Sequence, residues 1–223
     1  MSKTDTTTIR MTPKGRGYKV ENTKQERIEK VFEHARDTMT SPCAFHLITH
    51  IHDAELFRAA KSKGFIKEFQ RALKRQYKLL AKREPKEGHT KTKRPQKCPN
   101  TIIAYSIEYK LTSQKDIDGK EDAYKAVWEI ANGKLPFLHI HFYVIADCNQ
   151  TRPQNFTKHA MAALNELDGL RAARYAKTKD NKKYKPLNTD YDDAVLRAFY
   201  IGKVEQKSPE IPYRNSFDTS KVV

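Results

Sequence analysis

The sequence predicts an α+β domain in which a central antiparallel sheet is flanked by helices, and three observations support this fold class. Three segments rich in β-branched and aromatic residues, at 43–51, 101–109 and 137–146, have the length and composition of strands. Amphipathic segments with apolar residues at helical spacing accompany them. Strands and helices do not alternate strictly, as they would in a parallel crossover fold, so an antiparallel sheet covered by helices is expected.

The N-terminal region divides into a polar segment and a first helix. Residues 1–22 are polar, include the string "KGRG", and are typical of a flexible basic tail. In residues 24–39 the apolar side chains Ile28, Val31 and Phe32 recur at helical spacing. We therefore expect a tail that leads into an amphipathic helix.

A long helical region should follow the first strand. Asp53 is a suitable N-cap for a helix that ends near Arg83, and Gly64 should interrupt it, because glycine inside a helix costs about 1 kcal/mol. The loop at 84–100 is bounded by prolines and strongly basic, so it is either a solvated loop or a contact for phosphates. Its basic residues are Lys86, Lys91, Lys93, Arg94 and Lys97.

The remaining elements complete a single domain that we place at 23–207. The expected order is a strand at 101–109, a helix at 121–133, a strand at 137–146, a helix at 155–170 that Gly169 ends, a hairpin at 174–186, a helix at 188–207 and a C-terminal tail at 208–223.

The balance of charges indicates a polyanionic partner. Lys and Arg outnumber Asp and Glu by 43 to 27, which gives a formal net charge of +16. Proteins this basic commonly bind nucleic acid. No apolar stretch approaches the roughly 20 residues that span a bilayer, and the N-terminus lacks the apolar core of a secretory signal. We therefore expect an intracellular protein that binds nucleic acid and does not enter a membrane.

Two histidines in the strand at 137–146 could hold a metal ion. Alternate side chains of a strand share a face, so His139 and His141 point the same way and can converge on one cation. Glu108 in the strand at 101–109 can supply a third ligand, because it faces away from its apolar neighbours and a buried carboxylate must be paired or metal-bound. We expect a His-His-carboxylate site for Mg²⁺ or Mn²⁺, with the imidazoles favouring Mn²⁺.

A second His-Ile-His tripeptide occurs upstream, at His50 and His52. It lies where a strand ends and a capped helix begins, and no strand with an acidic residue of comparable character precedes it. For these two histidines we expect a structural or surface role.

The last helix carries a tyrosine among cations. At 100° per residue, Arg197, Tyr200, Lys203 and Lys207 share one side. Such a side is suited to a phosphodiester: a phenol is a weak nucleophile at neutral pH, but nearby lysines favour the phenolate and a metal on the phosphate lowers the barrier further. Packing is the alternative role for a helical tyrosine.

The order of these motifs resembles that of the HUH endonucleases, a superfamily of rolling-circle replication initiators, relaxases and transposases. "LHIHFYV" is similar to the His-hydrophobic-His strand of that superfamily, and "FYIGK" to its helix with a tyrosine and a nearby lysine. Within the superfamily the chain is most similar to the replication initiators of filamentous phages (inoviruses) and their prophage relatives. The similarity includes "YSIEY", "AFYIGKVEQK" and the closing "YRNSFDTSK", and it covers roughly residues 25–221.

The resemblance implies a single-strand DNA endonuclease with joining activity that starts rolling-circle replication. It implies that the two histidines and the glutamate bind the metal, that Tyr200 attacks the scissile phosphate, and that Lys203 contacts phosphate or tunes the site. The product would be a 5′-phosphotyrosine link and a free 3′-hydroxyl. The implied partners are single-stranded or origin DNA and host helicase or replication proteins, in the cytoplasm of a bacterial cell.

Two other functions stay open from the residues alone. A basic, repressor-like DNA-binding protein would use the histidines only in packing, although no helix-turn-helix pattern is present. A two-histidine RNA phosphoesterase is suggested by the duplicated tripeptide. That chemistry requires His-x-Thr or His-x-Ser twice, and this chain has histidine at the third position in both copies.

Overall fold

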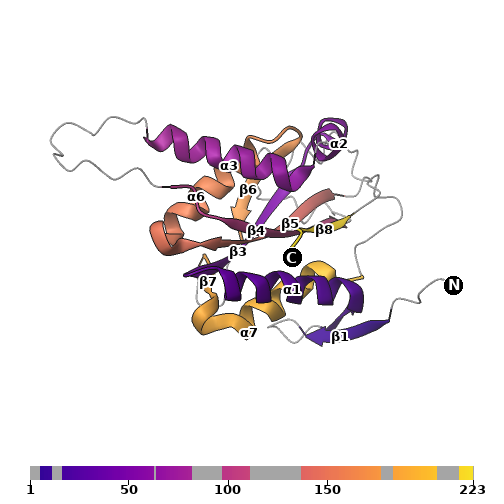
Figure 1. Cartoon of the computed structure of the whole chain (residues 1–223). Coiled ribbons are helices and arrows are strands. Elements are labelled where there is room, and N and C mark those ends of the chain that lie inside the picture. Colours follow the sequence, from indigo (N-terminus) through magenta and orange to yellow (C-terminus); the bar gives the residue numbers. More distant parts are fainter. Residues whose placement is uncertain are drawn as a thin grey trace, which may run out of the picture.

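A computed structural model describes the chain at residues 6–11, 17–62, 64–81, 97–110, 137–176, 183–204 and 216–222. Its centre is an antiparallel sheet in the strand order β6-β3-β5-β4-β8, with a short strand β7 that also pairs with β3. The strands are β3 (Pro42–Ile51), β4 (Thr101–Lys110), β5 (Phe137–Asp147), β6 (Leu170–Tyr175), β7 (Lys185–Pro186) and β8 (Phe217–Thr219). Helices cover both faces (Figure 1), so the predicted α+β fold with a central antiparallel sheet is confirmed.

One face of the sheet packs against α2 (Ala54–Ser62), α3 (Phe65–Ala81) and α6 (Pro153–Asn165). β5 contributes Ile140, Phe142 and Val144 to this core, as alternation along the strand predicts. The predicted cap is also present, because Asp53 Oδ1 accepts hydrogen bonds from the backbone N–H groups of Glu55 and Leu56 at 3.0 and 2.9 Å.

The opposite face packs against α1 (Asn22–Thr38), α7 (Leu187–Ala198) and the 3-10 turn η2 (Phe199–Gly202). In Figure 1 this layer lies below the sheet, and α3 lies above it. β5 contributes Tyr143 and Ile145 to this second cluster, whereas the polar residues His139 and His141 lie further along the same face. The apolar cluster therefore ends where the polar site begins.

The N-terminal segment, which its polarity predicted to be a flexible tail, forms strands in its described part. It contains an antiparallel hairpin of β1 (Thr7–Met11) and β2 (Gly17–Glu21). In β2 every second side chain is apolar, and Tyr18 and Val20 are buried in the second cluster. Val20 also forms a β-bridge with Lys203. The expectation failed because two buried side chains hold a short strand whose other residues are polar.

The C-terminal expectations need two corrections. The predicted helix at 188–207 ends as an α-helix at Ala198 and continues as η2, so Tyr200 lies in a 3-10 turn and Lys203 in the bridge to β2. The segment expected as a C-terminal tail contains β8, which pairs with β4. Sequence periodicity does not distinguish an α-helix from a final 3-10 turn, because side chains three residues apart meet in both.

Two further expectations concern the region around β6. The predicted helix at 155–170 ends at Asn165, and Leu170 already begins β6. The predicted hairpin at 174–186 is wrong in its pairing, because β6 and β7 both pair with β3 rather than with each other. The predicted helix at 121–133 lies outside the described residues.

Candidate metal centre

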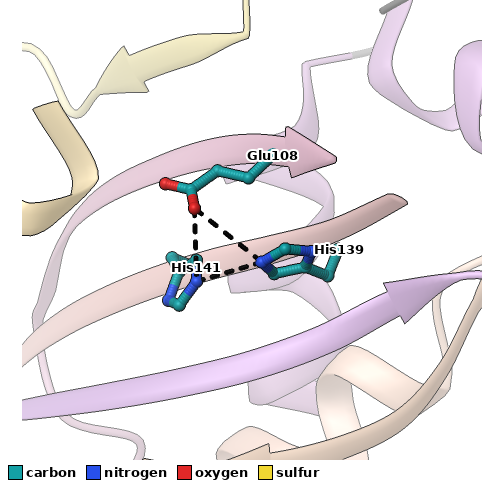
Figure 2. A group of neighbouring side chains, drawn as sticks. All are labelled: Glu108, His139 and His141. Carbon is teal, nitrogen blue, oxygen red and sulfur yellow. Dashed lines mark hydrogen bonds and ion pairs between the residues drawn. The ribbon is translucent and has the colours of Figure 1, made fainter. Parts of the chain in front are cut away.

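Three predicted ligands meet on the polar part of the sheet. Glu108 of β4 lies directly opposite His139 of β5, and His141 follows two residues later on the same face. His139 Nε2 and His141 Nε2 are 3.2 Å apart, and Glu108 Oε2 lies 3.8 and 3.5 Å from these two nitrogens. Figure 2 shows the carboxylate and both rings directed at one point. The structure thus brings together the three residues that the sequence proposed as a group.

These separations suit a shared cation. Ligand atoms about 2.1 Å from a metal lie roughly 3.0 Å apart in octahedral geometry and about 3.4 Å apart in tetrahedral geometry. The observed separations of 3.2 to 3.8 Å would need only small adjustments to match. Glu108, His139 and His141, here called the triad, form a group that could hold a metal ion. Two imidazoles and one carboxylate are compatible with several divalent metals, so the ligand set does not fix the identity of the ion.

Glu108 is fully buried and has an additional cationic partner. The Lys203 Nζ atom lies 2.6 Å from Glu108 Oε2, and Ser106 Oγ donates to Glu108 Oε1 at 3.4 Å. Lys203 is itself only 3% exposed, and its backbone is held by the bridge to Val20. A buried carboxylate requires such partners, because an isolated buried charge is very unfavourable. Lys203, which the sequence placed on the same side as Tyr200, therefore also balances the negative charge of Glu108.

Tyr200 lies against this group and is half-buried. Its ring centroid is 5.3 Å from that of His141 in an edge-on arrangement, and the Lys203 ammonium lies 3.6 Å from the Tyr200 centroid. Tyr18 of β2 contacts the Tyr200 ring at 5.6 Å between centroids. The 3-10 turn accounts for the pairing of Tyr200 with Lys203, since it places residues three apart above one another.

His46 of β3 supports the triad and was not singled out by sequence reasoning. His46 Nε2 lies 2.8 Å from His141 Nδ1, and the His46 ring stacks on Tyr143 at 4.3 Å. Burial lowers the pKa of His46 to about 3, with Arg197 and Lys203 acting in the same direction. A neutral His46 can accept a hydrogen bond from His141 Nδ1. His141 Nε2 then faces His139 and Glu108. Alternation along "CAFHLITHI" places His46 and His50 on one face of the strand. Their proximity to His139 and His141 follows only from the pairing of β3 with β5.

His50, for which we expected a structural or surface role, is buried and lies directly opposite His139. Its Nε2 atom is 2.6 Å from Arg174 Nη1. Burial lowers the pKa of His50 to about 3, with smaller contributions from Arg174 and His139. His52 lies just beyond the end of β3 and is half-buried, and desolvation lowers its pKa as well.

Of the residues proposed as DNA contacts, Arg197 and Lys97 lie in the described part of the chain. Arg197 forms an ion pair with Asp193 at 2.8 Å, and Lys185 lies 3.2 Å from the same carboxylate. Lys97 is exposed before the first residue of β4, whereas Glu108 is near the other end of that strand. The other proposed contacts lie outside the described residues: Lys86, Lys91, Lys93, Arg94 and Lys207.

Comparisons with known proteins do not assign the chain to a family. No family model matches it, and no match was found among curated proteins or solved structures. In the part of the chain that the structure describes, no helix combines the length and the apolar character needed to cross a membrane.

Proposed function

We propose that the protein is a metal-dependent single-strand DNA endonuclease with joining activity, which initiates rolling-circle replication and uses Tyr200 as its nucleophile. The observation that carries the proposal is the contact of one half-buried tyrosine and one buried lysine with a Glu-His-His group. Phosphoryl transfer needs a nucleophile, positive charge near the phosphate and a cation site within a few ångströms of one another. The resemblance to HUH endonucleases and the net charge of +16 favour single-stranded DNA as the substrate.

The chemistry is a transesterification. Glu108, His139 and His141 would hold a divalent ion, Mg²⁺ or Mn²⁺, which would neutralise charge on the scissile phosphate. Tyr200 Oη loses its proton to solvent and attacks the phosphorus, and the bond from phosphorus to the 3′ oxygen breaks. The leaving 3′ oxygen takes up a proton, so the products are a 5′-phosphotyrosine and a 3′-hydroxyl. Because the ester bond is exchanged rather than hydrolysed, the reverse attack rejoins a strand without a nucleotide cofactor.

Lys203 has two tasks in this reaction. Its ammonium lies on the face of the Tyr200 ring and beside the Glu108 carboxylate. The positive charge would attract a phosphate that approaches Tyr200 and would balance the carboxylate while no ion is bound.

The test is the formation of a covalent adduct. Wild-type protein incubated with Mn²⁺ and single strands that carry the replication origin should give a complex that survives denaturing electrophoresis, and Tyr200→Phe should give none. Tyr18→Phe is the matched control, because Tyr18 touches the Tyr200 ring but its hydroxyl donates to the backbone of Leu196 at 3.5 Å. This control should retain the adduct.

Two results would reject the proposal. The first is an undiminished adduct in Tyr200→Phe. The second is a wild-type protein that binds single strands but forms no adduct, which would leave the non-catalytic DNA-binding alternative. A calorimetric titration with Mn²⁺ tests metal binding independently of the nucleophile, and His139→Ala should lose affinity for Mn²⁺. His159→Ala is the control, because His159 contacts Tyr77, and it should keep its affinity for Mn²⁺.

A further inference from the structure

A row of polar residues crosses the sheet from the triad to its edge. Glu108 of β4 lies opposite His139 of β5, His139 lies opposite His50 of β3, and His50 lies opposite Arg171 of β6. Directly opposed residues in antiparallel strands share a face, so these side chains are on the same side of the sheet. Strands are spaced by about 4.8 Å, which places the Arg171 backbone roughly 10 Å from that of His139. The row thus joins the metal triad to an arginine on the edge strand.

A β-bulge puts a second arginine on this face. Ile48 pairs with Arg174 and His50 with Arg171, so two steps along β3 match three steps along β6. In a regular strand Arg171 and Arg174 would face opposite sides. The extra residue reverses this, with Ala172 at a φ of 53° in the left-handed region. A strained non-glycine residue persists only where its surroundings hold it.

Backbone groups at the bulge that lack a regular strand partner form hydrogen bonds with side chains. The Ala173 N–H donates to Asn165 Oδ1 at 2.8 Å, and Thr49 Oγ1 donates to the Arg171 carbonyl at 3.0 Å. The bulge is therefore a supported feature of β6. Its result is that two guanidinium groups lie on the same face as the metal triad.

These guanidinium groups can accept an anion. Arg171 and Arg174 are exposed, and neither forms an ion pair with a carboxylate of the described residues. Arg197, in contrast, is paired with Asp193. Arg174 is also oriented, because its Nη1 atom lies 2.6 Å from His50 Nε2. A guanidinium held through one nitrogen keeps its other N–H groups for a phosphate.

We propose that Arg171 and Arg174 bind a phosphate of single-stranded DNA next to the scissile one, so that the strand runs across β5 and β3 towards β6. This inference rests on the proposed function for its substrate. A chain of phosphates fits the row of polar residues better than an isolated anion does. The candidate metal site and the two arginines are separated by the width of two strands, which a single anion would not span. Guanidinium groups suit the role because they bind phosphate through two N–H groups at once.

The experiment measures binding of fluorescein-labelled dT20 by anisotropy over a range of salt concentrations, in EDTA and in Mn²⁺. The double variant Arg171→Gln/Arg174→Gln should bind about tenfold more weakly at low salt. Its log–log salt dependence should be less steep by about 0.7 for each phosphate that the variant no longer neutralises. Arg71→Gln/Arg75→Gln is the matched control: it removes the same charge from exposed positions on α3, on the opposite face of the sheet. This control should keep the wild-type slope.

Equal slopes in the two double variants would overturn the inference. A second pair, Arg171→Lys/Arg174→Lys, keeps the charge and removes the planar group, so it should keep the slope and lose a few-fold in affinity. Wild-type affinity in this lysine pair would also count against the inference, and the pair provides a test if the glutamine variant does not fold. The outcome is separate from that of the proposed function. An adduct without a slope difference rejects only the strand path, and a slope difference without any adduct rejects only the nuclease.

Discussion

Glu108 lies within reach of two kinds of cation. The Lys203 ammonium is 2.6 Å from Glu108 Oε2, and the same oxygen is the atom directed at the two imidazoles. A divalent ion bound by the triad would share this oxygen with the ammonium. At the scale of single residues, any affinity of these three residues for a metal ion would therefore be coupled to the position of the Lys203 side chain.

Replacing Lys203 with methionine tests this coupling. The variant leaves a buried carboxylate without its ammonium, so we expect the free energy of unfolding without metal to fall by about 3 kcal/mol. Mn²⁺ should then restore part of this stability, and it should raise the melting temperature more in Lys203→Met than in the wild type. Lys185→Met is the control, because Lys185 is also a buried lysine but pairs with Asp193 away from the triad. Equal stabilisation by Mn²⁺ in the wild type and in Lys203→Met would show that ammonium and metal do not compete.

His46 supports the orientation of the His141 ring. It contacts His141 Nδ1 at 2.8 Å and so fixes which nitrogen of His141 faces the triad. Removing such a supporting group typically lowers metal affinity by about 10- to 100-fold. We expect Mn²⁺ to bind at least about tenfold more weakly to His46→Ala in a calorimetric titration, with His159→Ala again as the unaffected control. Unchanged affinity in His46→Ala would mean that the rest of the sheet orients His141 without help.

His50 makes the stability of the fold depend on pH. Its pKa is lowered to about 3 in the folded protein, whereas an exposed histidine has a value near 6.5. Between these values the unfolded chain binds a proton that the folded chain does not, so stability falls as the pH falls below about 6.5. From pH 7 to pH 5 this group should account for a loss of about 2 kcal/mol. Urea unfolding at both pH values should show a loss smaller by about that amount in His50→Gln, and an equal loss in both proteins would contradict the assignment.

Sequence patterns reached part of the site and missed the rest for a physical reason. The sequence could predict the grouping of Glu108, His139 and His141, because it depends on local patterns. These patterns are the alternation of side chains within each strand and an acidic residue in an otherwise apolar strand. His46 and His50 could not be linked to them in the same way. Their proximity depends on β3 lying next to β5, and the order of strands in a sheet is set by long-range packing.

At the scale of elements, the bulge in β6 and the 3-10 turn η2 position the two arginines and the tyrosine on which the proposals depend. Both are short departures from regular geometry, at Ala172 and at Phe199–Gly202. The strands at 101–109 and 137–146 and the helix at 24–39 were predicted to within two residues, because their apolar patterns extend over many residues. The bulge and the turn involve only a few residues each and leave no comparable pattern in the sequence.

The strain at Ala172 can be measured by comparing two identical substitutions. A left-handed backbone costs a non-glycine residue about 1 kcal/mol or more, so Ala172→Gly should be neutral or slightly stabilising. The neighbouring change Ala173→Gly should destabilise by about 1 kcal/mol, because Ala173 packs on the core and has no such strain to relieve. Chemical unfolding of both variants gives the difference. If both lose the same free energy, the backbone at Ala172 is not strained.

For the whole molecule, the N-terminal hairpin is the part that connects distant regions of the chain. Tyr18 touches Tyr200, Val20 bridges to Lys203, and the Val204 N–H donates to the Lys19 carbonyl at 2.8 Å. β2 therefore buttresses the turn that carries the proposed nucleophile, although about 180 residues separate the two in sequence. If residues 1–22 were a tail, as their composition suggested, the turn would not depend on them.

Deleting residues 1–21 should distinguish these descriptions. The deletion removes Tyr18 and Val20 from the second core cluster, and full burial of such side chains contributes about 1.5 to 3 kcal/mol each. We expect the free energy of unfolding to fall by about 3 to 5 kcal/mol and hydrogen exchange in residues 199–204 to accelerate, with the Val204 amide among the most affected. The double substitution Ile9→Ser/Met11→Ser changes two exposed residues of β1 and should alter stability by no more than about 0.5 kcal/mol. A truncated protein with wild-type stability and unchanged protection at 199–204 would mean that the turn holds Tyr200 beside the triad without the hairpin.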